Sequence, residues 1–258
     1  MFGTDASAVS RPVPDATNEP VASSRSYRGE SSDHRHQRRW LALVDAGIEV
    51  FGIRGFPQAT MRDVCARARL SERYFYESFA NMQELYKEVY ASQRRGLLER
   101  LREAMSQAPP EYVAMAKAGQ RAFFTFIKED PRRVRIMLVD VKALRFTGLG
   151  QLDPAAEVYA LTPYVDLFGE FLAALYPMAD ELDMDMQVVH QTTIGMTVQL
   201  AVAWAAAGFD KSVDDIVRHT TFVYQGFDDW VKSMVAEKAR IKQSASLPAK
   251  VAGQRRAS

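Results

Sequence analysis

Apolar residues spaced three or four positions apart recur along most of this 258-residue chain. Trp40, Val44, Ile48 and Phe51 are spaced 4, 4 and 3 positions apart, which places them on one side of an α-helix. Everything between about residue 33 and residue 238 follows a helical pattern of this kind. The sequence therefore predicts an all-α protein.

The composition is typical of an ordinary globular protein, with 47% hydrophobic and 25% charged residues. The single cysteine, Cys65, excludes a disulfide within the chain and favours a reducing compartment, so we expect a cytoplasmic protein. Residues 1–30 lack the continuous apolar stretch of a signal peptide. Residues 186–209 carry no charge and are long enough to span a bilayer, but their glutamines, threonines and histidine favour a helix buried between other helices.

The two ends of the chain differ from its middle. Residues 1–32 are rich in Ser, Ala and Pro, and residues 239–258 are basic with Ser, Ala and Gln, so both are predicted to be disordered. The middle divides into a short-helix part, residues 33–80, and a larger helical part, residues 81–238. The helices expected in the larger part cover residues 82–107, 111–129, 131–145, 154–176, 185–207 and 212–237.

Two short helices follow the first long helix. Thr60 and Asp63 form a capping-box pattern at the start of one, and Ser71 is the N-cap candidate of the next. About three residues join the two helices, which is the spacing of a helix-turn-helix. Many α-helical proteins contain such a turn, so the spacing alone does not establish DNA binding.

The second short helix, LSERYFYESF at 70–79, is unusual in mixing aromatic and charged side chains. At about 100° per residue, Phe75 and Phe79 face the core, and Arg73 and Glu77 lie opposite with tyrosines on both flanks. Tyrosine and arginine suit phosphates and base edges, although an amphipathic surface helix with half-buried tyrosines would show the same pattern. Ten arginines and six acidic residues lie between residues 25 and 73, a local excess of +4 in a chain of net charge +1.

The run ALVDAGIEVFGIRGFPQATMRDVCARARLSERYFYESFANMQEL at 42–85 resembles the DNA-binding domain of the TetR (tetracycline-repressor) family of transcriptional regulators. The resemblance implies an N-terminal three-helix bundle with a helix-turn-helix, followed by a larger helical ligand-binding and dimerisation domain. The residues in register are Phe51, Gly55, Phe56, Thr60, Val64, Ala68, Ser71, Tyr76, Phe79 and Leu85.

The resemblance also implies roles for individual residues. Thr60 and Tyr76 would contact phosphates, and Glu72, Arg73 and Tyr74 would form the edge that reads bases. The whole expected DNA-binding set is Thr60, Arg69, Ser71, Glu72, Arg73, Tyr74 and Tyr76.

Two positions depart from the family pattern. The family often has Gly where this chain has Arg69, and a positive φ there would cost an arginine about 1 kcal/mol. The family usually has Lys where this chain has Met82, which removes one expected interaction with a phosphate. Arg35, Arg38, Arg39 and Arg69 are the candidates to replace it.

By the same resemblance, the larger domain should hold a pocket for a small, largely hydrophobic effector. The candidate lining residues, for which plain core packing is the alternative, are Phe123, Phe126, Met137, Tyr159, Tyr164, Phe168, His190 and Thr193.

Apolar residues in the last two helices repeat at spacings of 4, 3, 4, 3 and 4, as in helices that pack almost parallel or antiparallel. The two helices could pack on each other, or on a second subunit as in the family. A homodimer would present two recognition helices to a palindromic operator in double-stranded DNA. The expected interface residues are Val189, Met196, Leu200, Ala203, Ile216, Val223, Phe227 and Trp230.

No nucleophile elbow, P-loop or zinc motif is found, so we expect neither an enzyme nor a cofactor or metal site. The sequence predicts a ligand-responsive, sequence-specific DNA-binding regulator, most simply a repressor released by its effector. One alternative is an α-helical carrier or sensor whose N-terminal domain does not bind DNA. The other is an activator or a nonspecific DNA-binding protein.

Overall fold

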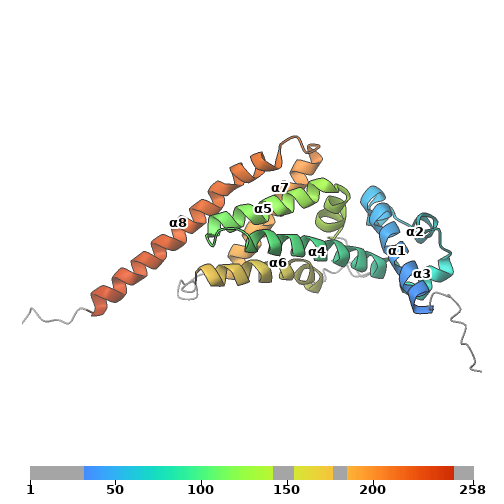
Figure 1. Cartoon of the computed structure of the whole chain (residues 1–258), viewed down its shortest axis with the longest axis horizontal. Coiled ribbons are helices and arrows are strands. Elements are labelled where there is room, and N and C mark those ends of the chain that lie inside the picture. The colour runs from blue at the N-terminus through green and yellow to red at the C-terminus, as the bar shows by residue number, and fades with distance from the viewer. Residues whose placement is uncertain (1–31, 142–153, 177–184, 247–258) are drawn as a thin grey trace, which may run out of the picture.

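A computed structural model describes residues 32–141, 154–176 and 185–246 of the chain, and all regular structure in these ranges is helical (Figure 1). The predicted all-α class is therefore confirmed. The elements are α1 (Ser32–Arg54), η1 (Phe56–Gln58), α2 (Met61–Ala68), α3 (Glu72–Ser78), α4 (Met82–Ser106), α5 (Tyr112–Glu129), η2 (Val134–Val139), α6 (Pro154–Leu175), α7 (Met186–Ala206) and α8 (Val213–Ser246).

The first three α-helices form a small bundle at one end of the molecule (Figure 1). α1 packs against α2, α3 and the start of α4, because each helix turns one apolar stripe inward. Leu43, Phe51, Val64, Phe75 and Leu85 are almost completely buried at the centre of the bundle.

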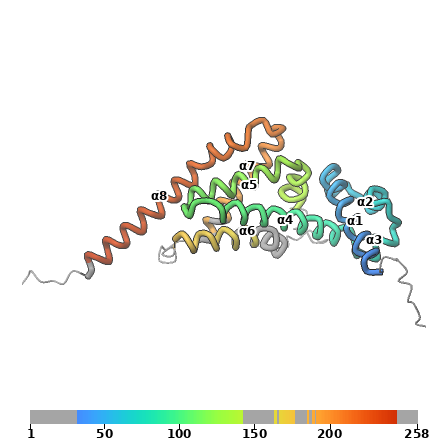
Figure 2. The backbone as a smooth tube through the Cα atoms, in the orientation of Figure 1, coloured from blue at the N-terminus to red at the C-terminus, as the bar shows by residue number. Residues whose placement is uncertain are grey.

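The remaining helices form a larger body. α4 leads from the small bundle along this body, where it packs against α5, and α5 packs in turn against α8 (Figure 2). Leu97 and Leu101 on α4 and Phe124 and Ile127 on α5 are buried in this body. α4 covers residues 82–106 and so matches the long helix expected there.

The segment after α5 differs from the α-helix predicted at 131–145. Residues 134–139 form a π-helical turn, η2, in which each hydrogen bond spans one residue more than in an α-helix. The hydroxyl of Tyr86 on α4 donates a hydrogen bond of 2.6 Å to the carbonyl oxygen of Ile136 in this turn. The periodicity of apolar residues cannot distinguish such a turn from an α-helix. The turn is instead accompanied by hydrogen bonds to residues far away in the sequence, such as Tyr86. Residues 142–145 of the prediction lie outside the described ranges.

α8 continues to Ser246, so the prediction of disorder from residue 239 was wrong for residues 239–246. Lysine, arginine, glutamine and alanine in this stretch are good helix formers, and Arg240 lies 3.5 Å from Glu237 one turn earlier. The basic composition that suggested disorder also suits an exposed helix. The second half of α8 extends away from the body (Figure 1). The disorder expected for residues 1–31 and 247–258 concerns residues outside the described ranges.

In the described ranges, no helix is long and apolar enough to cross a membrane.

Candidate DNA-binding helix and internal cavity

The start of α2 is capped as the sequence predicts. The backbone N–H of Asp63 donates to Thr60 Oγ1 at 3.2 Å, and the backbone N–H of Thr60 donates to Asp63 Oδ2 at 3.0 Å. Hydrogen bonds from the side chain and backbone of Thr60 hold the pKa of the Asp63 carboxyl below its usual value. The capping box therefore sets where α2 begins and places Thr60 at the exposed N-terminal end of that helix.

The turn between α2 and α3 depends on the backbone of Arg69. Its φ of 56° and ψ of 39° lie in the left-handed region, which is the condition under which an arginine is strained where the family often has glycine. The Arg69 and Leu70 N–H groups donate to the carbonyls of Ala66 and Cys65 and so close the end of α2. Ser71 then begins α3 in extended conformation, and the turn thereby sets the direction of the third helix.

α3 has the two faces predicted for it. Phe75 and Phe79 are 1% and 7% exposed and anchor the helix to the core, whereas the Tyr76 side chain is 61% exposed. Tyr74 is half-buried, because the Arg39 guanidinium of α1 lies 4.6 Å from the centre of its ring. The other expected DNA-binding residues are exposed, namely Thr60, Arg69, Ser71, Glu72 and Arg73.

The acidic residues of α3 are paired with arginines. Arg73 Nε lies 2.9 Å from Glu77 Oε1 one turn later, and Arg39 reaches the other oxygen of Glu77 at 3.8 Å. Glu72 lies 3.5 Å from Arg62 of α2. These pairs preset the orientation of the side chains on the outer face of α3.

Met82 stands where the family usually has a lysine, and its side chain has a different role. It is partly buried against the core and borders a shallow hollow with Met61, Phe75 and Tyr76. Its side chain therefore supports α3 through apolar packing.

The η2 segment connects the small bundle to the body. The Asp140 carboxylate, at the end of η2, accepts a hydrogen bond of 2.8 Å from the Phe56 N–H, and Arg135 donates one of 2.7 Å to the Ile53 carbonyl. Gly52 packs so closely that a Cβ there would lie 2.4 Å from Arg132 Cβ. We call these interactions the η2 junction. The sequence contained no signal for it, since its partners are about 80 residues apart or more.

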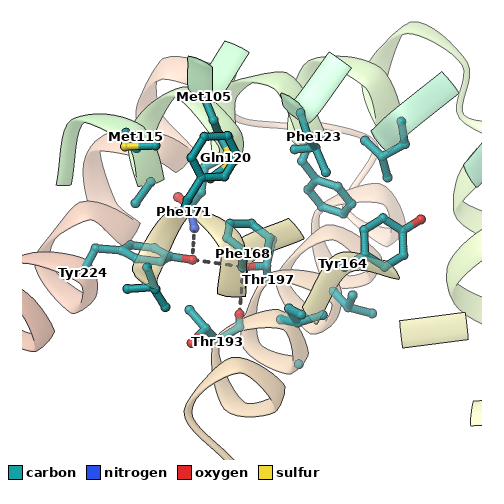
Figure 3. Close-up of a pocket in the computed structure, with 18 of the residues that line it drawn as sticks. Met105, Met115, Gln120, Phe123, Tyr164, Phe168, Phe171, Thr193, Thr197 and Tyr224 are labelled. Carbon is teal, nitrogen blue, oxygen red and sulfur yellow. Dashed lines mark hydrogen bonds between the residues drawn. The ribbon is translucent and has the colours of Figure 1, made fainter. Parts of the chain in front are cut away.

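A cavity of about 400 Å³ lies inside the body, between α4, α5, η2, α6 and α7 (Figure 3). Its wall is largely aromatic and aliphatic, and among the described residues around it none carries a charged side chain. Its volume and apolar wall are typical of a small-molecule site.

One side of the cavity carries a neutral polar cluster. Gln120 Nε2 donates to the Tyr224 hydroxyl at 2.7 Å, and the Thr197 hydroxyl lies 3.3 Å from the same oxygen (Figure 3). Behind the wall, Thr220 donates to Gln120 Oε1. Burial raises the pKa of Tyr224, so its hydroxyl stays protonated and available as a donor. This cluster was not predicted from the sequence, although Gln120 on the apolar side of α5 was a usable signal.

The structure brings five of the predicted pocket residues to the cavity, namely Phe123, Met137, Tyr164, Phe168 and Thr193. Phe126 was wrongly included. Its ring is buried, with the guanidinium groups of Arg133 and Arg100 at 3.7 and 5.2 Å from its centre, and it does not line the cavity. Tyr159 and His190 lie outside the residues whose side chains are described.

The apolar stripes of α7 and α8 pack mainly on other helices of the same chain. α8 packs mainly on α5, whereas α7 packs on α6, the η2 segment and α5. Ile216 is only 5% exposed in the core, so its assignment to a subunit interface was wrong. Val189 lines the cavity. The remaining expected interface residues are partly or well exposed, namely Met196, Leu200, Ala203, Val223, Phe227 and Trp230.

A capped second helix, a tight turn and an anchored third helix with an exposed polar face together form a helix-turn-helix, an arrangement that many DNA-binding domains use. Comparison with known proteins shows what this domain is similar to. Residues 43–89 match the family described as "Bacterial regulatory proteins, tetR family". The match covers the small bundle and the start of α4, and it leaves the rest of the chain outside it.

One curated relative is the HTH-type transcriptional activator FasR of Mycolicibacterium smegmatis, 31% identical over 103 residues. That alignment spans 40% of this chain and 46% of the relative, so the chain matches about half the relative's length.

Solved structures share the fold of the whole helical part. The fatty acid degradation regulator FadR of Bacillus halodurans superposes with a TM-score of 0.60 and 14% identity, over 73% of this chain and 95% of its own. FadR of Bacillus subtilis, solved in complex with stearoyl-CoA, gives a TM-score of 0.61 and 12% identity over 72% and 97%. The arrangement of α4 to α8 is thus that of known regulators.

The strained turn gives a testable prediction. Replacing Arg69 with Gly should raise the free energy of unfolding by up to about 1 kcal/mol, because glycine adopts a positive φ without the Cβ clash. The same change at Arg62, an exposed position inside α2, should lower it by about 1 kcal/mol. Urea unfolding of both variants provides the measurement, and an equal loss at the two positions would contradict the strain at Arg69.

Proposed function

We propose that this protein is a transcriptional regulator that reads a specific DNA sequence with α3 and changes its DNA affinity when a long acyl chain occupies the cavity. The observation that carries the proposal is the position of η2. Its segment contributes Met137, Leu138 and Val141 to the cavity wall, while Arg135 and Asp140 bond to the small bundle. An occupant that moves η2 therefore acts directly on the helices that position α3.

The exposed face of α3 supplies the means of reading DNA. Arg73 is well exposed, and an arginine fork pairs with the O6 and N7 atoms of guanine in the major groove. Tyr76 offers an exposed hydroxyl that can donate to a phosphate, and Thr60 lies exposed at the N-terminal end of α2, where backbone N–H groups favour an anion. The complete turn at Arg69 counts against the alternative of a carrier with an N-terminal domain unable to bind DNA.

The cavity wall favours a hydrocarbon chain as the effector. Each buried CH₂ group contributes about 0.8 kcal/mol, whereas a carboxylate in this cavity would have no cationic partner among the described wall residues. The cluster of Gln120, Thr197 and Tyr224 suits an uncharged acceptor such as a thioester carbonyl. The stearoyl-CoA bound to the Bacillus subtilis FadR structure is a ligand of this chemistry.

A homodimer would place two copies of α3 at a fixed distance from each other. Val188 on α7 and Phe222 and Trp230 on α8 are exposed by 56%, 73% and 43%, which is unusual for large apolar side chains in a single folded chain. A twofold pairing through α7 and α8 would cover them and place two α3 helices on one face of a palindromic site.

Either direction of regulation is compatible with this arrangement. The sequence predicts a repressor, whereas the relative FasR is named an activator. Repression and activation both follow from where the binding site lies relative to a promoter, and the structure of the protein is the same in both.

The first experiment selects duplexes from a random DNA pool with the purified chain and with Arg73→Ala. The wild type should enrich a palindromic motif, and Arg73→Ala should lose about 1–3 kcal/mol of discrimination at one base pair of each half-site. Arg102→Ala, an exposed arginine on α4, is the control and should retain the motif. Enrichment of no motif would contradict specific reading, and an unchanged motif with Arg73→Ala would contradict the role of that residue.

A second experiment titrates stearoyl-CoA, stearate and free coenzyme A against the protein bound to the selected duplex. Stearoyl-CoA should change the DNA dissociation constant at least about fivefold, and coenzyme A should not, because only the acyl chain fills the cavity. Ala116→Leu, which adds volume at a buried position in the cavity wall, should weaken this response. Ala118→Leu adds the same volume at a partly exposed position outside that wall and should respond like the wild type. An equal response to coenzyme A alone would contradict an acyl effector.

A third experiment tests transmission through the η2 junction. Asp140→Ala removes the acceptor of the Phe56 N–H, and the ratio of DNA dissociation constants with and without stearoyl-CoA should fall several-fold toward one. Asp140→Asn keeps a carbonyl acceptor and should preserve most of the ratio. The affinity for stearoyl-CoA, measured by calorimetry, should stay within about twofold in both variants, since Asp140 does not line the cavity. A full response in Asp140→Ala would exclude this route.

A further inference from the structure

We propose that the first two turns of α1 form a second DNA-contacting surface, which binds phosphates beside the recognition helix. We call it the α1 patch and define it by Arg35, Arg38 and Arg39. This inference rests on the proposed DNA-binding function and adds to it a source of affinity outside the helix-turn-helix.

The α1 patch belongs to a part of α1 that the family match does not include. α1 begins at Ser32, whereas the match begins at residue 43. Residues 32–38 are all exposed, so these turns do not serve the core of the bundle. A helical extension that buries no apolar surface gains little from packing, and its exposed charged side chains are within reach of another molecule.

Packing interactions hold this extension against α3. The Arg39 guanidinium covers the Tyr74 ring at 4.6 Å and reaches Glu77 at 3.8 Å. One residue later, Trp40 stacks on Phe79 at the end of α3, with 6.1 Å between ring centres. In Figure 1 the first turns of α1 accordingly lie beside α3. DNA that contacts α3 would pass close to these turns.

The charge of α3 explains why such a surface is needed. α3 contains Glu72, Arg73 and Glu77 and so has a net charge of −1. Three arginines of the bundle outside α3 form ion pairs with acids, and Met82 adds no charge. These ion pairs are Arg54 with Asp63, Arg62 with Glu72, and Arg67 with Glu49.

The α1 patch supplies the positive charge that α3 lacks. Residues 32–39 hold three arginines and one acidic residue, Asp33. Arg35 precedes Arg39 by one turn and lies on the same side of the helix, the side that meets α3. The N-terminal end of a helix adds a partial positive charge of its own. Among the described acids, Asp33 belongs to the same stretch of α1, and Arg39 and Arg73 share Glu77.

Arginines that bind phosphates raise affinity for every sequence and carry no base information. Arg39 also packs on Tyr74 and Glu77, so its removal would disturb α3 itself. The clean test is therefore the double variant Arg35→Ala/Arg38→Ala in the full chain, because both positions are exposed.

The experiment measures dissociation constants between roughly 50 and 300 mM salt, where the dependence on salt reports the number of neutralised phosphates. Two duplexes are used, one carrying the motif selected by the wild type and one with the same base composition in scrambled order. The double variant should bind both duplexes roughly tenfold more weakly, and its salt slope should fall by about 0.9 for each phosphate that is no longer neutralised. Arg102→Ala/Lys117→Ala removes the same charge from exposed positions on α4 and α5 and should match the wild type. Circular dichroism checks that the helices are intact.

Each result of the binding experiment supports or overturns the α1 patch. An unchanged affinity and slope, with the wild type still selective, would overturn the α1 patch and leave the proposed function standing. A loss of affinity confined to the selected motif would overturn the phosphate role, because it would indicate base reading. A loss on both duplexes in a protein that selects no motif would support the patch while contradicting sequence-specific regulation. A wild type that binds neither duplex would overturn both.

Discussion

The side chain of Tyr86 joins the three parts on which this structure depends. The residue lies on α4, its ring packs against Phe51 and Phe56 of the small bundle at 5.3 and 4.7 Å, and its hydroxyl bonds to the Ile136 carbonyl of η2. Burial raises the pKa of this phenol well above its ordinary value, so it acts as a permanent donor. A buried donor deprived of its acceptor would cost about 1–3 kcal/mol, which resists separation of the bundle from the body.

This buried hydrogen bond helps to hold the η2 segment between the cavity and the small bundle. One side of the segment faces the cavity, and the other bonds to η1 and the end of α1. Packed interiors deform little, so a change on one side of a short, well-bonded turn displaces what lies on the other. The proposed coupling between cavity and DNA-binding helix thus needs only local packing, without a long chain of intermediates.

The two candidate binding regions differ in their electrostatics. The cavity wall, as far as the structure describes it, is neutral, and the groups of its polar cluster form hydrogen bonds with one another. The surface around α3 is instead a network of arginines and acids, in which Arg39 and Arg73 share Glu77. The first arrangement suits a buried hydrocarbon, and the second suits a polyanion that competes with the acids for the arginines.

Local features of this protein could be predicted from the sequence, and its long-range ones could not. Helical spacing, the Thr60–Asp63 cap and the left-handed turn at Arg69 each depend on residues within a few positions, and the structure contains all three. The resemblance at 42–85 added the expected roles of the third helix.

Tertiary structure alone decided the long-range features. Phe126 is buried like its neighbours on α5, yet its ring contacts two arginines and does not line the cavity. The polar cluster joins Gln120 to Tyr224 across 104 positions, and the η2 junction joins Phe56 to Asp140 across 84. Periodicity reports which side of a helix is apolar, whereas the partner that covers it is set by packing between distant segments.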